Sequence, residues 1–268
     1  MTSDGFPLIL KMPVEKKGNF IIFLGSGGAR IVVFKQIRAS GGIWLSLDGV
    51  NLLVDPGPGS LVRITSSKHK LNPTELDAIL LSHRHLDHSG DVNILIEAIT
   101  TGGTVKRGEL FCPEDALFGE DPVVFKYLRS YLNKITIIKE KGEYEVNGLK
   151  FSCPIRHKHR GETFGFKFLT KNQIISYIAD TQFFSDLIPA YQGDILILNV
   201  VRDKPSDLDH LSLSDAKSLI LGIKPKVCFL THFGMTVLKR KPWVLAEEMS
   251  QETGIKVIAA SDGLKYEI

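Results

Sequence analysis

The chain has 268 residues, 43% of them hydrophobic, which is enough apolar material to fill a large core. Its formal net charge of +3 permits an anionic substrate but is too small for a protein that coats nucleic acid. No apolar run approaches the ~18 residues of a membrane span, and the N-terminus lacks a basic-then-apolar signal pattern, so we expect a soluble cytoplasmic protein.

The three cysteines, Cys112, Cys153 and Cys228, each lie in or beside an apolar, strand-like run. Their odd number and the lack of paired spacing argue against a disulfide framework and favour a reducing compartment. We therefore expect them to act as small buried hydrophobic residues.

The first predicted element is a strand at residues 20–24, a short apolar run. A glycine-rich turn follows at 25–30. The turn lacks the Gly-x-Gly-x-x-Gly spacing of dinucleotide sites, and residues 31–37 continue with β-type sequence instead of a helix. We expect this turn to bring the backbone close to another element, such as the functional site.

A hairpin is predicted next, because residues 42–47 and 50–54 flank Asp48-Gly49, a dipeptide typical of tight hairpin turns. Asp55 follows the second strand. It is either a structural carboxylate near the histidine-rich loop described next or an ordinary turn residue. Residues 60–68 then have a helical pattern.

The next segment carries the chemistry. A strand-like run is followed by the histidine loop, residues 83–88, which reads His-Arg-His-Leu-Asp-His. Three imidazoles and a carboxylate so close together cannot all be buried unpaired, because desolvation costs too much, and binding a metal removes that cost. The donors are nitrogen and oxygen without thiolate, which favours Zn²⁺ first, then Mn²⁺ or Fe. His83 and His85 can face one ion, and Asp87 and His88 a second.

Beyond a helix that runs to about Thr100, strands and helices alternate to the end of the chain. Helices are expected at 123–132, 212–221 and 242–252, with Ser212 or Ser214 as the N-cap of the second. Asn147-Gly148 predicts another hairpin turn. Strands are expected at 109–112, 135–138, 143–146, 149–153, 163–169, 174–179, 194–200, 227–230, 256–259 and 263–267.

A second cluster of basic and imidazole side chains occupies residues 156–160. Arg156, Lys158 and Arg160 form either a positive wall for a phosphate or a solvated charged turn. His157 and His159 are two residues apart, so in an extended chain they share a face. Periodicity alone therefore does not decide which of the two is a metal ligand.

His83 and His85, Asp180, and His232 each follow an apolar strand-like run. Ligands on turns that a sheet holds in place make a rigid site. The two largely β halves of the chain, each with its helices, fit two sheets packed face to face with helices outside.

The histidine loop, together with Asp180-Thr181 and Thr231-His232-Phe233, resembles the metallo-β-lactamase superfamily. The resemblance covers essentially the whole chain. It implies an α/β fold, the αβ/βα four-layer sandwich with two mixed β-sheets face to face, as a single domain over residues 1–268.

Within that superfamily the sequence is most similar to the ribonuclease Z-like branch and the phosphoribosyl cyclic phosphodiesterases. The segment 159–166 resembles the third-ligand segment of the branch, and its spacing to Phe164-Gly165 favours His159 over His157. By this resemblance, each of two divalent ions has three ligands of its own and shares a bridging aspartate. The first set is His83, His85 and His159, the second is Asp87, His88 and His232, and Asp180 is the bridge.

His210-Leu211-Ser212 resembles the branch's non-ligand histidine segment, so we expect His210 to be catalytic or to contact phosphate. It precedes a helix start and lies beside Asp207 and Asp209, which could keep it protonated near neutral pH. The alternative is a surface histidine paired with one of those aspartates. Asp55 and Asp262 are candidates to fix the imidazole tautomers from behind.

The leading functional hypothesis is a phosphodiesterase that acts on a small or cyclic anionic phosphodiester or on an RNA end. Two ions ~3.5–4 Å apart would lower the pKa of a shared water, which would attack phosphorus, with Asp87 orienting or deprotonating it. A thioesterase or lactonase of glyoxalase II type shares these ligand types, and a non-catalytic metal-binding scaffold is a third alternative. Processing of tRNA is disfavoured, because only 20 residues separate His159 from Asp180 and leave no room for a long tRNA-gripping arm.

Overall fold

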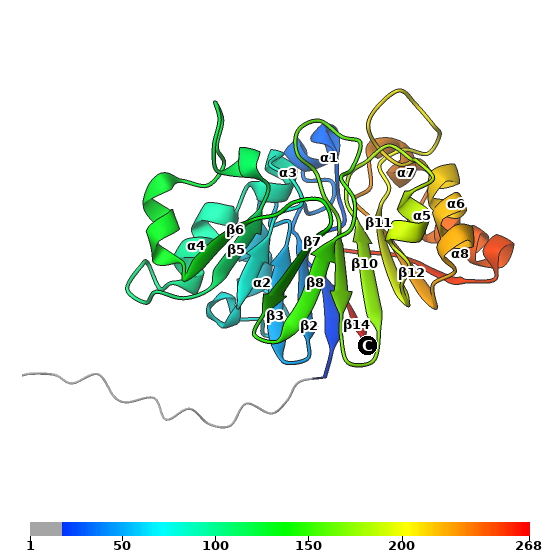
Figure 1. The fold of residues 1–268 in the computed structure, drawn as a ribbon. Coiled ribbons are helices and arrows are strands. Elements are labelled where there is room, and N and C mark those ends of the chain that lie inside the picture. Colours follow the sequence, from blue (N-terminus) through cyan, green and yellow to red (C-terminus); the bar gives the residue numbers. More distant parts are fainter. Residues whose placement is uncertain (1–17) are drawn as a thin grey trace, which may run out of the picture.

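The computed structural model describes residues 18–268, so the expectation about a signal pattern at the N-terminus lies outside the described residues. Two seven-stranded sheets pack face to face with helices outside them (Figure 1). This confirms the predicted αβ/βα sandwich. Among residues 18–268, no helix combines the length and the apolar character needed to cross a bilayer.

The first sheet has the strand order β14-β1-β2-β3-β4-β5-β6. Strands β3 to β6 run parallel to one another, whereas β1 pairs antiparallel with both β2 and β14. Asp48 and Gly49 both have positive φ in the β2–β3 turn, which is the backbone of the predicted tight hairpin. The bounds are β1 (Phe20–Phe23), β2 (Ile43–Leu47), β3 (Val50–Val54), β4 (Ala78–Leu80), β5 (Glu109–Cys112), β6 (Lys134–Ile137) and β14 (Leu264–Glu267).

The second sheet has the order β13-β12-β11-β10-β9-β8-β7, and β10 to β13 are parallel. Strands β7 to β10 form an antiparallel meander. The bounds are β7 (Gly142–Val146), β8 (Leu149–Cys153), β9 (Phe166–Leu169), β10 (Ile174–Ile178), β11 (Ile195–Asn199), β12 (Val227–Thr231) and β13 (Lys256–Ala259).

The helices cover the outer faces of the two sheets, except that α1 and α3 lie at the edge between them (Figure 1). Ser212 caps α6 in a capping box with Asp215, which settles the choice between Ser212 and Ser214. The α-helices are α1 (Arg30–Phe34), α2 (Ser60–Thr65), α3 (Leu86–Ser89), α4 (Val92–Ile99), α5 (Leu187–Ala190), α6 (Leu213–Ile223), α7 (Met235–Lys239) and α8 (Pro242–Thr253). The 3-10 helices are η1 (Pro73–Glu75), η2 (Glu114–Ala116) and η3 (Lys126–Tyr131).

Buried apolar side chains form three layers. The central layer lies between the sheets, a second lies between the first sheet and α4, and a third lies between the second sheet and the helices α6 and α8. Each layer contains one cysteine, Cys153, Cys112 and Cys228 respectively, and all three are free and buried. The predicted role of the cysteines as buried hydrophobic residues is confirmed.

Two predicted elements are wrong. Residues 31–37 were expected to be β-type, but α1 occupies most of that segment. Strand β1 already pairs with β2 and β14 on its two sides, so no sheet edge is left for another strand there. The helix predicted at 123–132 is instead the 3-10 helix η3. The guanidinium of Arg129 hydrogen bonds to the carbonyl of Val124, an acceptor that an α-helix would have paired with a backbone amide, and to the carbonyl of Leu117 outside the predicted helix.

The parallel strands place polar residues at one edge of the sandwich. Asp55 follows β3 and the histidine loop follows β4 in the first sheet, while Asp180 follows β10 and His232 follows β12 in the second. Because parallel strands share the direction of their carboxyl ends, all of these residues meet where the two sheets adjoin.

Candidate metal centre

The histidine loop runs from β4 into the single turn of α3, which presents His88 on the protein interior. The Ser89 hydroxyl donates to the carbonyls of Arg84 and His85 and so closes the loop on itself. The backbone N–H of Ser82 donates to Asp55 Oδ1 at 2.6 Å, which ties the start of the loop to the end of β3.

Three histidines form what we call the outer group, His83, His85 and His159. The Nδ1 atom of His85 lies 3.0 Å from His83 Nε2 and 3.1 Å from His159 Nε2. The opposite nitrogens of two of these rings face acceptors. His83 Nδ1 lies 2.9 Å from the Ser82 hydroxyl, and His159 Nδ1 lies 2.8 Å from the backbone carbonyl of Asp209.

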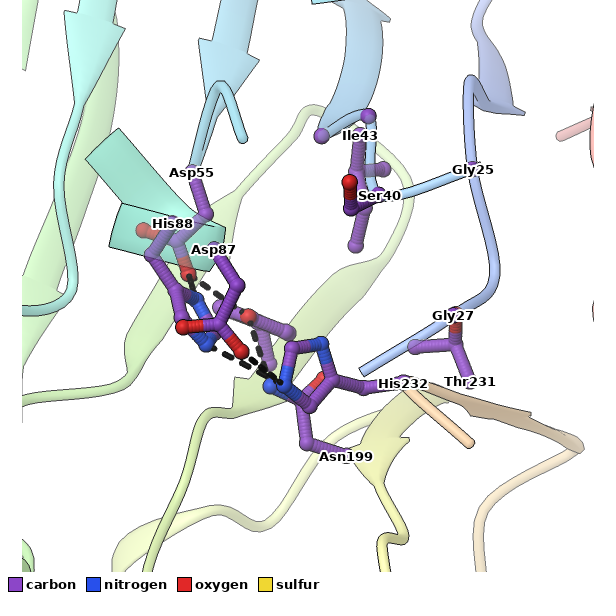
Figure 2. Close-up of a pocket in the computed structure, with 13 residues that line it drawn as sticks. Gly25, Gly27, Ser40, Ile43, Asp55, Asp87, His88, Asn199, Thr231 and His232 are labelled. Atoms are coloured by element: carbon purple, nitrogen blue, oxygen red, sulfur yellow. Dashed lines mark hydrogen bonds and ion pairs between the residues drawn. The ribbon is translucent and has the colours of Figure 1, made fainter. Parts of the chain in front are cut away.

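Four residues form the inner group, Asp87, His88, Asp180 and His232. The Nε2 atoms of His88 and His232 are 3.2 Å apart, and Asp87 Oδ2 lies 3.4 Å from His232 Nε2. Asp180 Oδ2 lies 3.5 Å from His88 Nε2 and 3.6 Å from His232 Nε2. In Figure 2 the side chains of Asp87, His88 and His232 point toward one another beside a small cavity.

Glycine-rich backbone holds His232 in place. His232 has φ of 57°, a left-handed conformation that is uncommon for a residue with a side chain. The segment is fixed on both sides, since Phe233 N–H donates to the Ser26 carbonyl and Gly28 N–H donates to the Phe233 carbonyl. A Cβ on Gly28 would lie 2.2 Å from Cδ2 of His232, so any side chain at this position would displace the His232 ring. The prediction that the glycine-rich turn approaches another element is confirmed, and that element is the segment that carries His232.

Asp55 is the buried support of the inner group. Its Oδ2 accepts hydrogen bonds from the Ser82 hydroxyl at 2.7 Å and the Tyr177 hydroxyl at 2.7 Å, and lies 3.0 Å from His88 Nδ1. Of the two expectations for Asp55, the structural carboxylate is the correct one. Asp262, the other candidate, accepts instead from Ser26 and from the backbone N–H of Ala39, so it fixes the glycine-rich turn and not an imidazole.

These contacts fit a metal site. The acceptors at Nδ1 of His83 and His159 assign the ring proton to that nitrogen, which leaves the lone pair of each Nε2 directed into the cluster. Lone pairs brought within about 3 Å of one another repel unless a cation lies between them. In the described part of the chain, four ligand sets have donor atoms that lie within 4.8 Å of one another. They are His83–His85–His159, His83–His88–Asp180, Asp87–His88–His232 and His159–Asp180–His210.

The two groups differ in their electrostatics. Burial lowers the pKa of His83 well below its ordinary value and lowers the pKa of His85 to about 4. Burial also disfavours the charged form of His88, but Asp180 and Asp55 outweigh it and raise the pKa of that imidazole. Burial alone would raise the pKa of Asp180, yet His232 and His88 hold it well below the usual range. The inner group is therefore charge-paired even without a metal.

His210 lies against the cluster. Its Nε2 is 3.3 Å from Asp180 Oδ2, and its Nδ1 is buried without a hydrogen-bond partner among the described residues. Burial lowers the pKa of His210, but its hydrogen bond to Asp180 more than compensates, and the net shift is upward. No described contact pairs it with Asp207 or Asp209, so the surface-pair alternative is wrong and Asp180 is its partner.

The basic turn, residues 156–160, directs its side chains to different places. His157 points inward, is 3% exposed and lies 2.8 Å from the Tyr191 hydroxyl, away from the donor sets described above. His159 is the member that joins the outer group. Arg156, Lys158 and Arg160 are exposed, and none of the hydrogen bonds and ion pairs of residues 18–268 joins them to the cluster. The Lys158 ammonium lies over the Phe184 ring, 4.8 Å from its centroid.

Sequence reasoning missed three buried polar residues behind the cluster, Tyr177, Tyr191 and Asn199. Tyr177 donates to Asp55, Tyr191 contacts His157, and Asn199 donates to Asp180. Asn199 had a usable signal, because it ends the otherwise apolar run of β11 at the edge where the ligands gather. The tyrosines had none, because a tyrosine in a buried strand or helix is an ordinary core residue.

Comparisons with known proteins agree with this architecture. Residues 50–233 match a family model described as the Beta-lactamase superfamily domain. The uncharacterized protein MJ1374 of Methanocaldococcus jannaschii is 37% identical over 257 residues, which cover 92% of this chain and 94% of that protein.

Two similar solved structures share the fold over nearly their whole length. The metallo-beta-lactamase fold protein YhfI of Bacillus subtilis has a TM-score of 0.78 at 18% identity, covering 94% of this chain and 100% of that one. A diphosphatase of the PhnP family has a TM-score of 0.70 at 23% identity, covering 94% and 98%. From the family match and the archaeal relative, the chain belongs to the metallo-β-lactamase superfamily.

Proposed function

We propose that the protein is a metal-dependent hydrolase of the ribonuclease Z-like branch that cleaves a small or cyclic phosphodiester or an RNA end. One observation carries the proposal. All the ligand-type residues expected from the sequence converge at one edge of the sandwich, with His210 beside them on Asp180. A scaffold with a vestigial site would have no reason to retain this complete set of facing donors.

The residues suit two divalent ions, with Zn²⁺ first and Mn²⁺ or Fe as alternatives. The outer group would hold one ion, Asp87, His88 and His232 would hold the other, and Asp180 would lie between them. When bound, such a pair lowers the pKa of a water and stabilises charge that develops on the substrate oxygen. Asp87 Oδ2 is placed to orient that water or accept its proton, since it faces the cluster beside His232.

We assign His210 to the leaving group and not to a metal. Its Nε2 lies 3.3 Å from Asp180 Oδ2 at the edge of the cluster and its side chain is 22% exposed, whereas Nδ1 is buried, so we assign Nε2 to the substrate oxygen. A positioned histidine that donates a proton to a leaving alkoxide typically contributes ~10²–10⁴ in rate. This role, and the PhnP-family fold relative that is named a diphosphatase, favour phosphorus over a carbonyl carbon as the reacting atom.

Processing of tRNA receives no support from the segment between His159 and Asp180. It contains the β9–β10 hairpin, whose turn at residues 170–173 lies at the far end of the sheet beside Asp48. A thioesterase or lactonase activity shares the ligand types and is the outcome to test against.

The experiment compares turnover of bis(p-nitrophenyl) phosphate with a panel of thioesters and lactones by zinc-reconstituted protein. We expect the phosphodiester to be preferred and elemental analysis to approach two equivalents of metal. Preference for the thioesters, or a ceiling of one equivalent that Asp87→Ala and His88→Ala leave undisturbed, would overturn the proposal.

His210→Ala tests the proposed role of His210. We expect unchanged metal content and a far larger fall in kcat on an alkyl phosphodiester than on a nitrophenyl one, because a poor leaving group needs the proton more. Equal losses would indicate phosphate binding, and loss of metal would make His210 a ligand. His69→Ala is the matched control, since the His69 ring contacts the Gly263 carbonyl and belongs to none of the donor sets found among residues 18–268.

A further inference from the structure

Asp180 is held from behind at two separate points. Its carboxylate Oδ1 accepts a hydrogen bond from Asn199 Nδ2 at 2.9 Å. Its backbone carbonyl oxygen lies 3.3 Å from His157 Nδ1. These contacts leave only Oδ2 to face the cluster, where it lies 3.3 to 3.6 Å from the Nε2 atoms of His210, His88 and His232.

The hydrogen bonds behind His157 fix which of its nitrogens carries the proton. The backbone N–H of Gly165 donates to the Tyr191 hydroxyl at 3.1 Å, so this hydroxyl is free to donate its own proton to His157 Nε2 at 2.8 Å. The ring proton is then on Nδ1, where it donates to the Asp180 carbonyl. The three hydrogen bonds therefore all point the same way. Gly165 donates to Tyr191, Tyr191 donates to His157, and His157 donates to the Asp180 carbonyl.

The second arm begins at Asp55. The Tyr177 hydroxyl donates to Asp55 Oδ2 at 2.7 Å, so it accepts from Asn199 Nδ2 at 3.2 Å. The Asn199 amide nitrogen thus directs one proton to Tyr177 and the other to Asp180. A flipped amide would place its oxygen against the Asp180 carboxylate, so this orientation is the only one that satisfies both contacts.

The four supporting side chains lie in the core. His157, Tyr177, Tyr191 and Asn199 are each at most 3% exposed, so no solvent replaces a lost partner. Packing also sets the conformations of the two tyrosines. Tyr177 is part of the central apolar layer, and Tyr191 is part of the layer between the second sheet and the helices α6 and α8. A buried, fully paired network of this kind holds a side chain more precisely than its separate bonds would.

Asp180 also shares one donor set with His83 and another with His159, which are members of the outer group. We propose that His157 and Asn199 are positioning residues that orient Asp180 so that its single oxygen Oδ2 serves both the outer group and the other members of the inner group. The proposal rests on the proposed function, in which Asp180 lies between two ions. An oxygen that both groups share would couple the binding of the two ions, whereas a freely rotating carboxylate would serve one group at a time. Neither positioning residue touches the reacting atoms.

The test measures zinc affinity by chelator competition, without substrate, in Asn199→Leu and His157→Leu. We expect each to weaken binding of the zinc that contacts Asp180 by about 10- to 100-fold, the usual effect of losing a partner behind a ligand. His157→Asn should restore most of the affinity, because the asparagine amide places an N–H near the position of Nδ1. Ser176→Ala is the control, since Ser176 is equally buried on the same strand as Tyr177 but its hydroxyl has no hydrogen-bond partner within residues 18–268.

A positioning role also predicts a spectroscopic change. In cobalt-substituted protein the visible absorption of Asn199→Leu should shift, whereas that of Ser176→Ala should not. Wild-type affinity in both leucine variants, or a loss in His157→Asn as large as in His157→Leu, would overturn the proposal. Failure of the proposed function is a separate result, namely wild-type protein that binds zinc but turns over no phosphodiester. Should His157→Leu fail to fold, Asn199→Leu and His157→Asn still decide.

Discussion

The outer and inner groups use the same kinds of side chain but are supported in different ways. The outer group rests on neutral acceptors, the Ser82 hydroxyl and the Asp209 carbonyl, and two of its three rings are partly exposed. The inner group rests on the buried carboxylate of Asp55 and on the backbone of Gly28.

The difference is one of support, because a buried carboxylate lies behind the inner group and only neutral acceptors lie behind the outer group. A charged acceptor makes a stronger hydrogen bond than a neutral one, and burial removes the competition of water. We therefore expect an ion at the inner group to be held more tightly, and an ion at the outer group to exchange more readily.

The largest expected effect follows from removing the charge behind the inner group. In Asp55→Asn, an amide replaces the carboxylate that accepts from His88, Ser82 and Tyr177, and the amide nitrogen cannot accept a hydrogen bond. We expect about 3–5 kcal/mol lower unfolding free energy in denaturant titrations, together with loss of the inner metal, because breaking one partner strands buried polar groups. Asp209→Asn is the control. Its backbone carbonyl, which His159 uses, is unchanged, so near wild-type stability is expected.

A smaller effect is expected from steric pressure on the same group. Gly28→Ala forces a methyl against the His232 ring, so the ring must move away from its neighbours. We expect zinc affinity at the inner group to fall by about 10- to 100-fold while the outer group keeps its ion. Gly18→Ala, where a Cβ meets nothing within 4 Å, should bind zinc like wild type. Equal loss from both groups would contradict the comparison.

In metal-free protein, acidification should change the contributions of the two groups to stability in opposite directions. The folded pKa of His85 is about 4 against an ordinary 6.5, so folding excludes a proton from it. Its stabilising contribution is present above pH 6.5 and is lost as pH falls toward 4. We expect about 1 kcal/mol less stability at pH 5 than at pH 7 from this residue, after allowance for its partial exposure. His85→Ala should reduce the pH dependence of the unfolding free energy. The raised pKa of His88 gives the opposite sign, with stability lost as pH rises through the folded value.

The smallest effect concerns the basic turn beside the outer group. Arg160 is exposed and Lys158 is turned onto Phe184, so neither is placed to bind phosphate closely. We expect Arg160→Ala to raise the KM for an anionic substrate by only about two- to three-fold at low salt, and less at high salt. Lys171→Ala, in the turn at the opposite end of the sheet, should change nothing. A loss above tenfold would show that Arg160 contacts the substrate.

The sequence predicted most strands and the polar ends that carry the cluster, because both signals are local. The choice between His157 and His159 was not local. Residues 157–162 form a turn instead of an extended strand, so the two side chains do not share a face as alternation suggested. Only the packing of Tyr191 shows why His157 points inward.

The elements that the sequence predicted wrongly have different causes. In α1, Ile31 and Phe34 are 50% and 70% exposed, so their β-type pattern reflects no burial on a sheet. In η3, the Arg129 guanidinium bonds to the Val124 carbonyl in place of a backbone amide. Helix α2 ends at Thr65, earlier than the predicted 68, where the Thr65 and Ser66 hydroxyls bond back to carbonyls of the preceding turn. The α1 outcome depends on how distant strands pair, whereas the other two depend on local side-chain bonds that propensity alone does not reveal.

Each apolar layer contains one cysteine, so the reactivity of each thiol can be used to measure local opening of its layer. Burial raises the pKa of the Cys112 thiol to about 12 and raises the other two further, so none reacts with alkylating reagents while its layer is closed. Reaction then requires a fluctuation that admits water, and its rate reports the free energy of that opening. Mass spectrometry of the three labelled peptides would rank the layers by the free energy needed to open each one. Cys112, Cys153 and Cys228 modified at one common rate would mean that the whole sandwich opens as a single unit.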